Sequence, residues 1–349
     1  MTHRTKVALG IGAGVLLLAG GIFVLIGGRD AISHIPVIGR LAAKPKCPLT
    51  GRSPAHESVL KRPAVAVKVE NNPAAYPLSG LEKADVVFEE EVEGGLSRFM
   101  AIYHCGDATK VGPVRSARVV DPDIMRPITR ILADAGSNAI VDKALAKAHI
   151  TVIDELSAGA AMRRVPRPGI SSEHTLYANT AALRKIGKKH YKRPPADDIF
   201  KFGGLQKDVS KKARTITINF SSGNIAGYKW SKGHWLRFQD GSPMMAESGH
   251  QIAVTDVIIE QHKVNYSKTI VDVLGNPSTE IADVTGSGRA VLFRDGRAIK
   301  GKWSRSSISQ PVHFSTRSGD EMQLKPGNVW IELVPSQKGD VKGSFSFAK

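Results

Sequence analysis

Four glutamates crowd one short predicted strand, and their charge is the first sign of possible chemistry in this sequence. They are Glu89, Glu90, Glu91 and Glu93. Side chains alternate between the two faces of a strand, so like charges repel on each face. Two interpretations are open: a solvated edge strand that resists aggregation, or a carboxylate site that binds a cation or neutralises arginines.

Three arginines follow closely in the sequence. Arg98 comes after the Gly94-Gly95 turn, and Arg115 and Arg118 lie in the stretch Gly-Pro-Val-Arg-Ser-Ala-Arg, which also contains Ser116. A guanidinium group binds phosphate or carboxylate in bidentate fashion. Arg115 and Arg118 converge if a helical turn begins here and diverge if a strand continues. They form either an anion site or structural ion pairs with Glu89 or Glu93.

Further candidates lie on both sides of this region. Asn71 lies in a loop with two prolines, and Gly136-Ser137-Asn138 opens a predicted helix. A helix start can bind an anion through its free N–H groups, but Ser137 or Asn138 can equally be the N-cap. His174 and Tyr177 follow an arginine-rich loop, and the chain contains no HExxH motif or His/Cys cluster for a metal.

The elements that position these residues are expected to be both strands and helices. Residues 63–70 predict a strand, and residues 85–92 and 97–105 predict a hairpin around the glycine pair. A buried strand over 128–135 then leads into an Ala-rich helix over 139–148. This strand–turn–helix order predicts an α/β (α+β) first domain over 61–205.

The second domain, over 206–349, is predicted to be mostly β. A basic segment with Pro194-Pro195 and Gly203-Gly204 precedes it, and alternating apolar residues follow at 215–220, 252–260 and 329–334. The Asp295-Gly296 pair between two apolar runs is a strong hairpin signal.

Composition narrows the possible partners. The 349 residues include 49 Lys and Arg against 32 Asp and Glu, a net charge of +17 that favours anionic partners. We expect no nucleic-acid partner, because the chain lacks a module that interleaves aromatic and basic residues. Two cysteines exclude a dense disulfide scaffold; Cys47 and Cys105 either pair in an oxidising compartment or stay as free thiols. Protein partners cannot be named from the sequence.

The N-terminal region predicts a membrane anchor. Residues 7–28 carry no charge, and a helix needs about 20 residues to cross a bilayer. A cleaved signal peptide is the alternative, but its apolar core would be shorter. We therefore predict a cytoplasmic tail over 1–6, a transmembrane helix over 7–28 and a linker over 29–60. The bulk of the chain is then extracytoplasmic, in a single-pass protein of the cell membrane.

Several motifs resemble a family of bacterial envelope proteins, the YerB-like lipoproteins, which share a two-part domain of unknown function. The similarity runs from about Pro48 to Pro335. The motifs that carry it are Ser79-Gly80-Leu81, Ala84-Asp85-Val86-Val87, Val92-Glu93-Gly94-Gly95, Gly112 to Arg118, His174 with Tyr177, Trp303-Ser304-Arg305 and Pro326 to Ile331. In the loop near Asn71, Glu70 replaces the usual Asp and Tyr76 replaces an Arg. The resemblance implies an envelope location and a two-part fold, but no reaction.

We expect this protein to bind an anionic envelope lipid or wall polymer through an Arg/Glu cluster, without a cofactor. The expected ligand residues are Asn71, Glu89, Glu93, Arg98, Arg115, Ser116, Arg118, Gly136, Ser137, His174 and Tyr177. A shorter likeness to the LytR-CpsA-Psr phosphotransferases, at Pro113 to Ser116, suggests an alternative. That alternative is an enzyme on lipid-linked or wall-polymer phosphate, with Mg²⁺ held by Glu89 and Glu93. Whether the protein is an enzyme stays open.

Overall fold

The computed structural model describes residues 17–18, 21–22, 44–272 and 274–349. The chain divides into the units Met1–Lys44 and Pro45–Lys349. In the first unit, β1 (Leu17–Leu18) and β2 (Gly21–Ile22) pair antiparallel. The rest of the predicted anchor over 7–28, the tail over 1–6 and the linker up to residue 43 lie outside the described residues. Among the helices that are described, none has the length and apolar character needed to span a bilayer.

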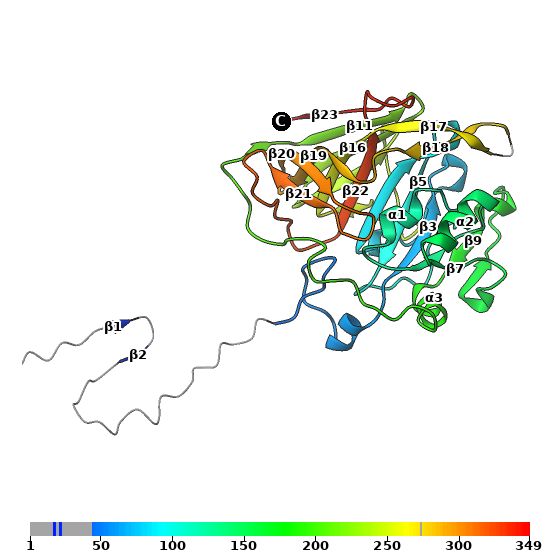
Figure 1. Ribbon diagram of the computed structural model, residues 1–349, viewed down its shortest axis with the longest axis horizontal. Coiled ribbons are helices and arrows are strands. Elements are labelled where there is room, and N and C mark those ends of the chain that lie inside the picture. Colours follow the sequence, from blue (N-terminus) through cyan, green and yellow to red (C-terminus); the bar gives the residue numbers. More distant parts are fainter. Residues whose placement is uncertain (1–16, 19–20, 23–43, 273) are drawn as a thin grey trace, which may run out of the picture. The chain divides into compact units, whose positions relative to one another are not determined.

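The second unit is built on one large mixed sheet (Figure 1). From edge to edge its strands are β10 (Ser210–Lys212), β20 (Arg297–Arg305), β19 (Gly286–Arg294), β16 (Asp256–His262), β22 (Val329–Pro335), β4 (Val86–Glu91), β5 (Ser97–Tyr103), β3 (Val65–Glu70), β6 (Ile131–Ala133) and β7 (Thr151–Ile153), and β21 (His313–Thr316) pairs with β20. Strand β4 comes from the first part of the chain and β22 from the second, and the two pair in parallel. The sheet therefore combines strands from both parts.

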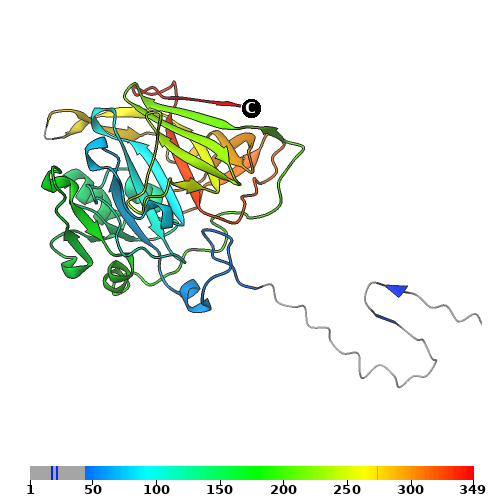
Figure 2. The same ribbon diagram turned by 180° about the vertical axis from the view of Figure 1, so that it is seen from behind.

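A second sheet covers one face of the large one (Figure 2). Its strands are β14 (Ser242–Pro243), β13 (His234–Gln239), β12 (Asn224–Ser231), β11 (Thr215–Ser221) and β23 (Ser344–Ala348), and β15 (Ala253–Val254) pairs with β13. Period-two patterning gives both sheets an apolar face, and these faces form one core. Within it, the ring of Trp235 lies 5.9 Å from that of Phe293.

Within the described residues, the α-helices all lie in the first part of the chain. They are α1 (Asp121–Met125), α2 (Ala139–Lys147) and α3 (Thr180–Gly187). Met125 of α1 and Leu145 of α2 pack with Phe88 on the face opposite the second sheet, whereas Leu183 of α3 joins the core on the other face. The prediction of a first part that carries the helices and a second part made mostly of strands is confirmed.

Two hairpins and one disulfide complete the unit. The hairpins are β8 (Met162–Arg164) with β9 (Leu176–Ala178), and β17 (Val264–Val271) with β18 (Pro277–Ile281). Cys47 and Cys105 form a disulfide with their Cα atoms 6.1 Å apart. Cys47 and Leu49 are buried, so the described end of the predicted linker packs against the body of the protein.

The glutamate-rich strand β4 is central in the large sheet, between β22 and β5. Glu89, Glu90, Glu91 and Glu93 are all buried. The solvated edge strand that the sequence left open is therefore wrong. β22 comes from the far end of the chain. It forms the hydrogen bonds along the edge of β4 that the local sequence suggested would be exposed to solvent.

Candidate functional site

A cleft of about 820 Å³ opens at the ends of β3 and β5, beside the start of α2 and the β17–β18 hairpin. It gathers most of the residues expected at a ligand site. Those that line it are Asn71, Glu93, Arg98, Arg115, Ser116, Arg118, Gly136 and Ser137. We call this the arginine cleft. Its wall also contains Glu70, Asn72, Glu173 and Asp272, which the sequence analysis did not place there.

The backbone of residues 112–118 holds two of the arginines in place. Gly112 has a φ of 145°, and a Cβ at this position would lie 2.7 Å from the carbonyl oxygen of Leu176, so only glycine fits. The N–H of Arg115 donates to Lys68 O at 3.0 Å, and its carbonyl accepts from the N–H of Ala135, also at 3.0 Å. The segment is neither helix nor strand, yet Arg115 and Arg118 both face the cleft.

Arg118 is neutralised by Glu93. Its Nε donates to Glu93 Oε2 at 2.9 Å, and Nη2 donates to the same oxygen. Ser278 donates to Glu93 Oε1 at 2.6 Å. Burial alone would raise the pKa of Glu93, but the Arg118 cation and the Ser278 hydrogen bond outweigh it and lower the pKa. Both carboxylate oxygens are therefore engaged within the protein.

Arg115 is paired as well, although more loosely. Its Nε lies 3.1 Å from Glu70 Oε1, and its Nη1 lies 3.6 Å from Glu173 Oε2. The other oxygen of Glu70 lies 2.7 Å from His174 Nδ1. His174 is buried behind Glu70 and supports the cleft without lining it.

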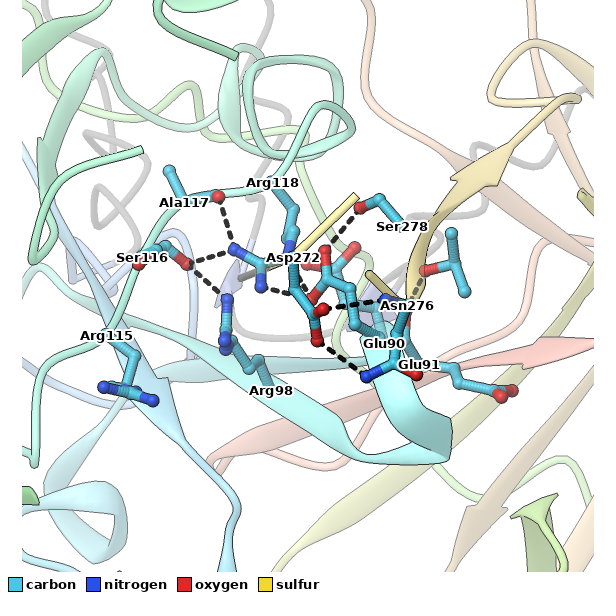
Figure 3. A network of polar contacts seen from close by, with 12 residues as sticks. Glu90, Glu91, Arg98, Arg115, Ser116, Ala117, Arg118, Asp272, Asn276 and Ser278 are labelled. Atoms are coloured by element: carbon cyan, nitrogen blue, oxygen red, sulfur yellow. Dashed lines mark hydrogen bonds and ion pairs between the residues drawn. The ribbon is translucent and has the colours of Figure 1, made fainter. Parts of the chain in front are cut away.

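Arg98 differs from its two neighbours (Figure 3). Its Nη1 donates to the carbonyl of Ser116 at 3.0 Å, and Arg118 Nη1 donates to the same oxygen at 3.3 Å. Among the described residues, no carboxylate lies within ion-pair distance of Arg98. Burial, followed by the Arg118 cation, lowers the pKa of Arg98 to about 9. The cleft thus holds a half-buried cation with no carboxylate within ion-pair distance among the described residues, although the more distant Glu93 and Glu70 favour its charge.

The start of α2 contributes backbone to the wall of the cleft. Asn138 is the N-cap, because its side chain accepts from the N–H groups of Ile140 and Val141 at 3.0 Å each. Ser137 instead donates to Asp142 at 2.5 Å. Gly136 has a φ of 91°, which positions the turn before the helix. Of the two residues that the sequence offered as N-cap, Asn138 fills the role.

Besides His174, two of the expected ligand residues do not line the cleft. Glu89 faces the second sheet, where its Oε2 accepts from Arg237 Nη2 at 2.7 Å. Tyr177 is buried, and Lys110 Nζ lies 4.3 Å from the centre of its ring. Asn71 lines the cleft, but its side chain donates to Ser97 Oγ at 2.7 Å and is used inside the protein.

The carboxylates assigned to Mg²⁺ in the alternative are therefore not neighbours in one open site. Glu89 pairs with Arg237, and Glu93 pairs with Arg118. Across the part of the chain that the structure describes, no three His, Cys, Asp or Glu side chains are grouped so that they could hold a metal ion.

A signal for one missed residue was present in the sequence. Glu70 ends a predicted strand directly before the Asn71 loop, so a carboxylate at that strand end could have been matched with Arg115. No local pattern pointed to Glu173 or Asp272, because the cleft is completed by segments that are remote in sequence.

Comparison with known proteins gives matches over most of the chain. The N-terminal domain of the family described as "Protein of unknown function (DUF3048)" matches residues 49–193, and its C-terminal domain matches residues 216–331. The protein of Bacillus subtilis (strain 168) named "Putative lipoprotein YerB" is 28% identical over 303 residues, which cover 84% of this chain and 87% of that protein.

The fold agrees with a solved relative. The crystal structure of the YerB protein from Bacillus subtilis superposes with a TM-score of 0.70 at 26% identity, and the match covers 87% of this chain and 100% of that one. The resemblance to YerB-like proteins found in the sequence is thereby confirmed. The chain belongs to the DUF3048 family.

Proposed function

We propose that this protein is a membrane-associated, extracytoplasmic binding protein that holds an anionic envelope ligand in the arginine cleft. The observation that carries the proposal is Arg98, a half-buried guanidinium without a carboxylate partner among the described residues. A desolvated cation is stabilised by an anion that takes the place of water. The cleft leaves room for such an anion beside Arg98.

The location rests on three features. The relative from Bacillus subtilis is named as a lipoprotein. The uncharged segment over 7–28 can anchor this chain as a single-pass protein. The Cys47–Cys105 disulfide suits an oxidising compartment. Fractionation of intact cells tests the location: we expect the chain in the membrane pellet and open to protease added from outside. A soluble or protease-protected chain would contradict it.

The binding test uses methyl phosphate as the probe, with the full chain in a non-ionic detergent at low salt. Ligand-observed NMR should show binding by the wild type. Arg98→Gln should weaken it about 10- to 100-fold, because a charge-assisted hydrogen-bond pair is lost. Repeating the titration with Mg²⁺ and following the release of methanol and inorganic phosphate tests in the same samples whether the cleft acts on a phosphate ester with water as the acceptor.

The matched control is Lys188→Gln, which removes one equally positive but fully solvated charge at the end of α3. It should change binding by less than about twofold, because screened surface charges contribute little. Equal losses in the two variants would show diffuse electrostatics and remove the case for a site at Arg98.

A further inference from the structure

The mouth of the arginine cleft carries exposed apolar side chains on one of its walls. Val271 is 59% exposed and Leu274 is 83% exposed, and both line the cleft from the β17–β18 hairpin. Ile140, two residues beyond the N-cap Asn138, is 42% exposed but does not line the cleft. Single exposed apolar residues are ordinary, and Leu156, at 94% exposed, is one that does not line the cleft. What distinguishes Val271 and Leu274 is that they share a cavity with Arg98.

The charge inside the cleft limits the size of the anion. Glu93 neutralises Arg118, and Glu70 pairs with Arg115. Arg98 is therefore the one cleft arginine for which the described residues supply no carboxylate within ion-pair distance. One such guanidinium suits a single phosphate or carboxylate group. A polyanionic wall polymer would bring further negative charges close to Glu173 and Asp272, which also line the cleft.

The lining also argues against a sugar chain as the main contact. None of the described residues that line the cleft is aromatic. The apolar faces of sugar rings pack well on flat aromatic side chains, whereas a branched valine or leucine suits a flexible hydrocarbon chain. The wall thus combines a place for one anionic group with a place for aliphatic carbon.

We propose that the ligand of the arginine cleft is an anionic amphiphile, with its phosphate or carboxylate at Arg98 and its hydrocarbon chain against Val271 and Leu274. This inference rests on the proposed function and narrows it to a lipid class of ligand. Burying an apolar chain there would also remove the exposed surfaces of Val271 and Leu274 from water.

The test compares hexyl phosphate with methyl phosphate on the full chain, since the two share the anionic group and differ only in the hydrocarbon. Complete burial of one methylene strengthens binding about fourfold. Even partial burial of the additional methylenes should therefore make hexyl phosphate bind at least about tenfold more tightly than methyl phosphate. The double variant Val271→Ser with Leu274→Ser should reduce this preference to about twofold.

Leu156→Ser is the matched control, because it removes a leucine outside the cleft that is at least as exposed as Leu274. It should leave the preference for hexyl phosphate intact. Two results would contradict the proposal of an amphiphilic ligand: equal affinity for the two phosphates, or a preference for hexyl phosphate that persists in the double variant. Neither result would contradict the proposed anion site. If neither phosphate binds the wild type, the proposed function fails as well.

Discussion

Two clusters of arginine and glutamate lie on opposite faces of the large sheet, and they differ in what covers them. Glu89 on β4 pairs with Arg237 in the space between the two sheets, where both side chains are 0% exposed. Arg98 on β5 points to the other face, into the arginine cleft (Figure 3). The same residue types thus serve as an internal ion pair on one face and as part of an open cavity on the other.

We call Glu89 and Arg237, with the residues that bond to them, the sealed cluster. Its buried charges have a counter-charge and several hydrogen-bond partners. Arg237 also donates to Phe238 O at 2.8 Å and to Gln239 Oε1 at 3.0 Å. Burial alone would lower the pKa of Arg237, but the Glu89 charge raises it above its usual value. Ser97 Oγ donates to the other oxygen of Glu89 at 2.6 Å. Arg237 Nε has no hydrogen-bond partner among the described residues, but the pair carries its own counter-charge and has no need of a charged ligand.

In the arginine cleft, Arg98 has no such counter-charge in contact with it. Among the described residues, no second sheet covers Arg98, and its hydrogen-bond partner is a carbonyl oxygen and not a carboxylate. The comparison teaches that an Arg/Glu-rich sequence does not by itself indicate a binding site. What distinguishes the two clusters is whether a carboxylate lies within ion-pair distance of the guanidinium in the folded protein.

The largest effect is expected when the sealed pair is broken. Glu89→Gln leaves the Arg237 cation buried without its counter-charge, which should lower the free energy of unfolding by about 3–5 kcal/mol. Urea denaturation followed by circular dichroism measures the change.

Glu332→Gln is the control for that experiment. Glu332 lies in the same cluster and accepts a hydrogen bond from Tyr228. Burial, followed by the Glu89 charge, raises its pKa well above the usual value and so favours the neutral side chain. The substitution should change stability by less than about 1 kcal/mol. Equal losses from Glu89→Gln and Glu332→Gln would show that packing, and not the buried charge, dominates this cluster.

A smaller effect is expected at Glu91, at the end of β4. This carboxyl is buried, its Oε2 has no hydrogen-bond partner among the described residues, and burial raises its pKa to about 8. A raised pKa means that the folded state holds a proton which the unfolded state releases from about pH 4.5 upward. The contribution of Glu91 to stability is therefore present below about pH 4.5 and lost as the pH rises to about 8.

Glu91→Gln should remove this dependence, because the amide does not titrate. Relative to the wild type, the variant should be more stable by about 1–2 kcal/mol at pH 8 and show no gain at pH 4.5. Thermal unfolding at the two pH values checks the sign. A gain of the same size at both would assign the effect to packing.

The sequence predicted the strands and the arginines of the cleft better than their surroundings. Strands β3, β4, β5 and β6 and helix α2 follow from local periodicity and turn residues, and Asp295-Gly296 forms the expected turn between β19 and β20. Arg98, Arg115 and Arg118 were expected together because they lie close in the chain. Local patterns are sufficient when the partners of a residue are also local.

The remaining features depend on contacts between distant segments. The central position of β4 results from pairing with β22, and the fate of Glu89 is decided by Arg237 on β13. Neither segment carries a motif that points back to β4. The hairpin with Val271 and Leu274 also reaches the cleft through contacts between distant segments. No spacing of residues in the sequence predicts this position.

The smallest effect is expected at Arg98, and it should have the opposite sign to the effect at Glu89. Burial and the neighbouring Arg118 lower the pKa of Arg98 to about 9, so folding disfavours its charge at neutral pH. Arg98→Gln removes that half-buried cation and should raise the free energy of unfolding by about 0.5–1 kcal/mol, even though it weakens anion binding. At the same concentration, methyl phosphate should stabilise the wild type against urea clearly more than the variant, whose affinity is lower, because a ligand stabilises only the state that binds it. A loss of stability in Arg98→Gln without ligand would mean that the guanidinium is structural, and the distinction between the sealed cluster and the open cleft would disappear.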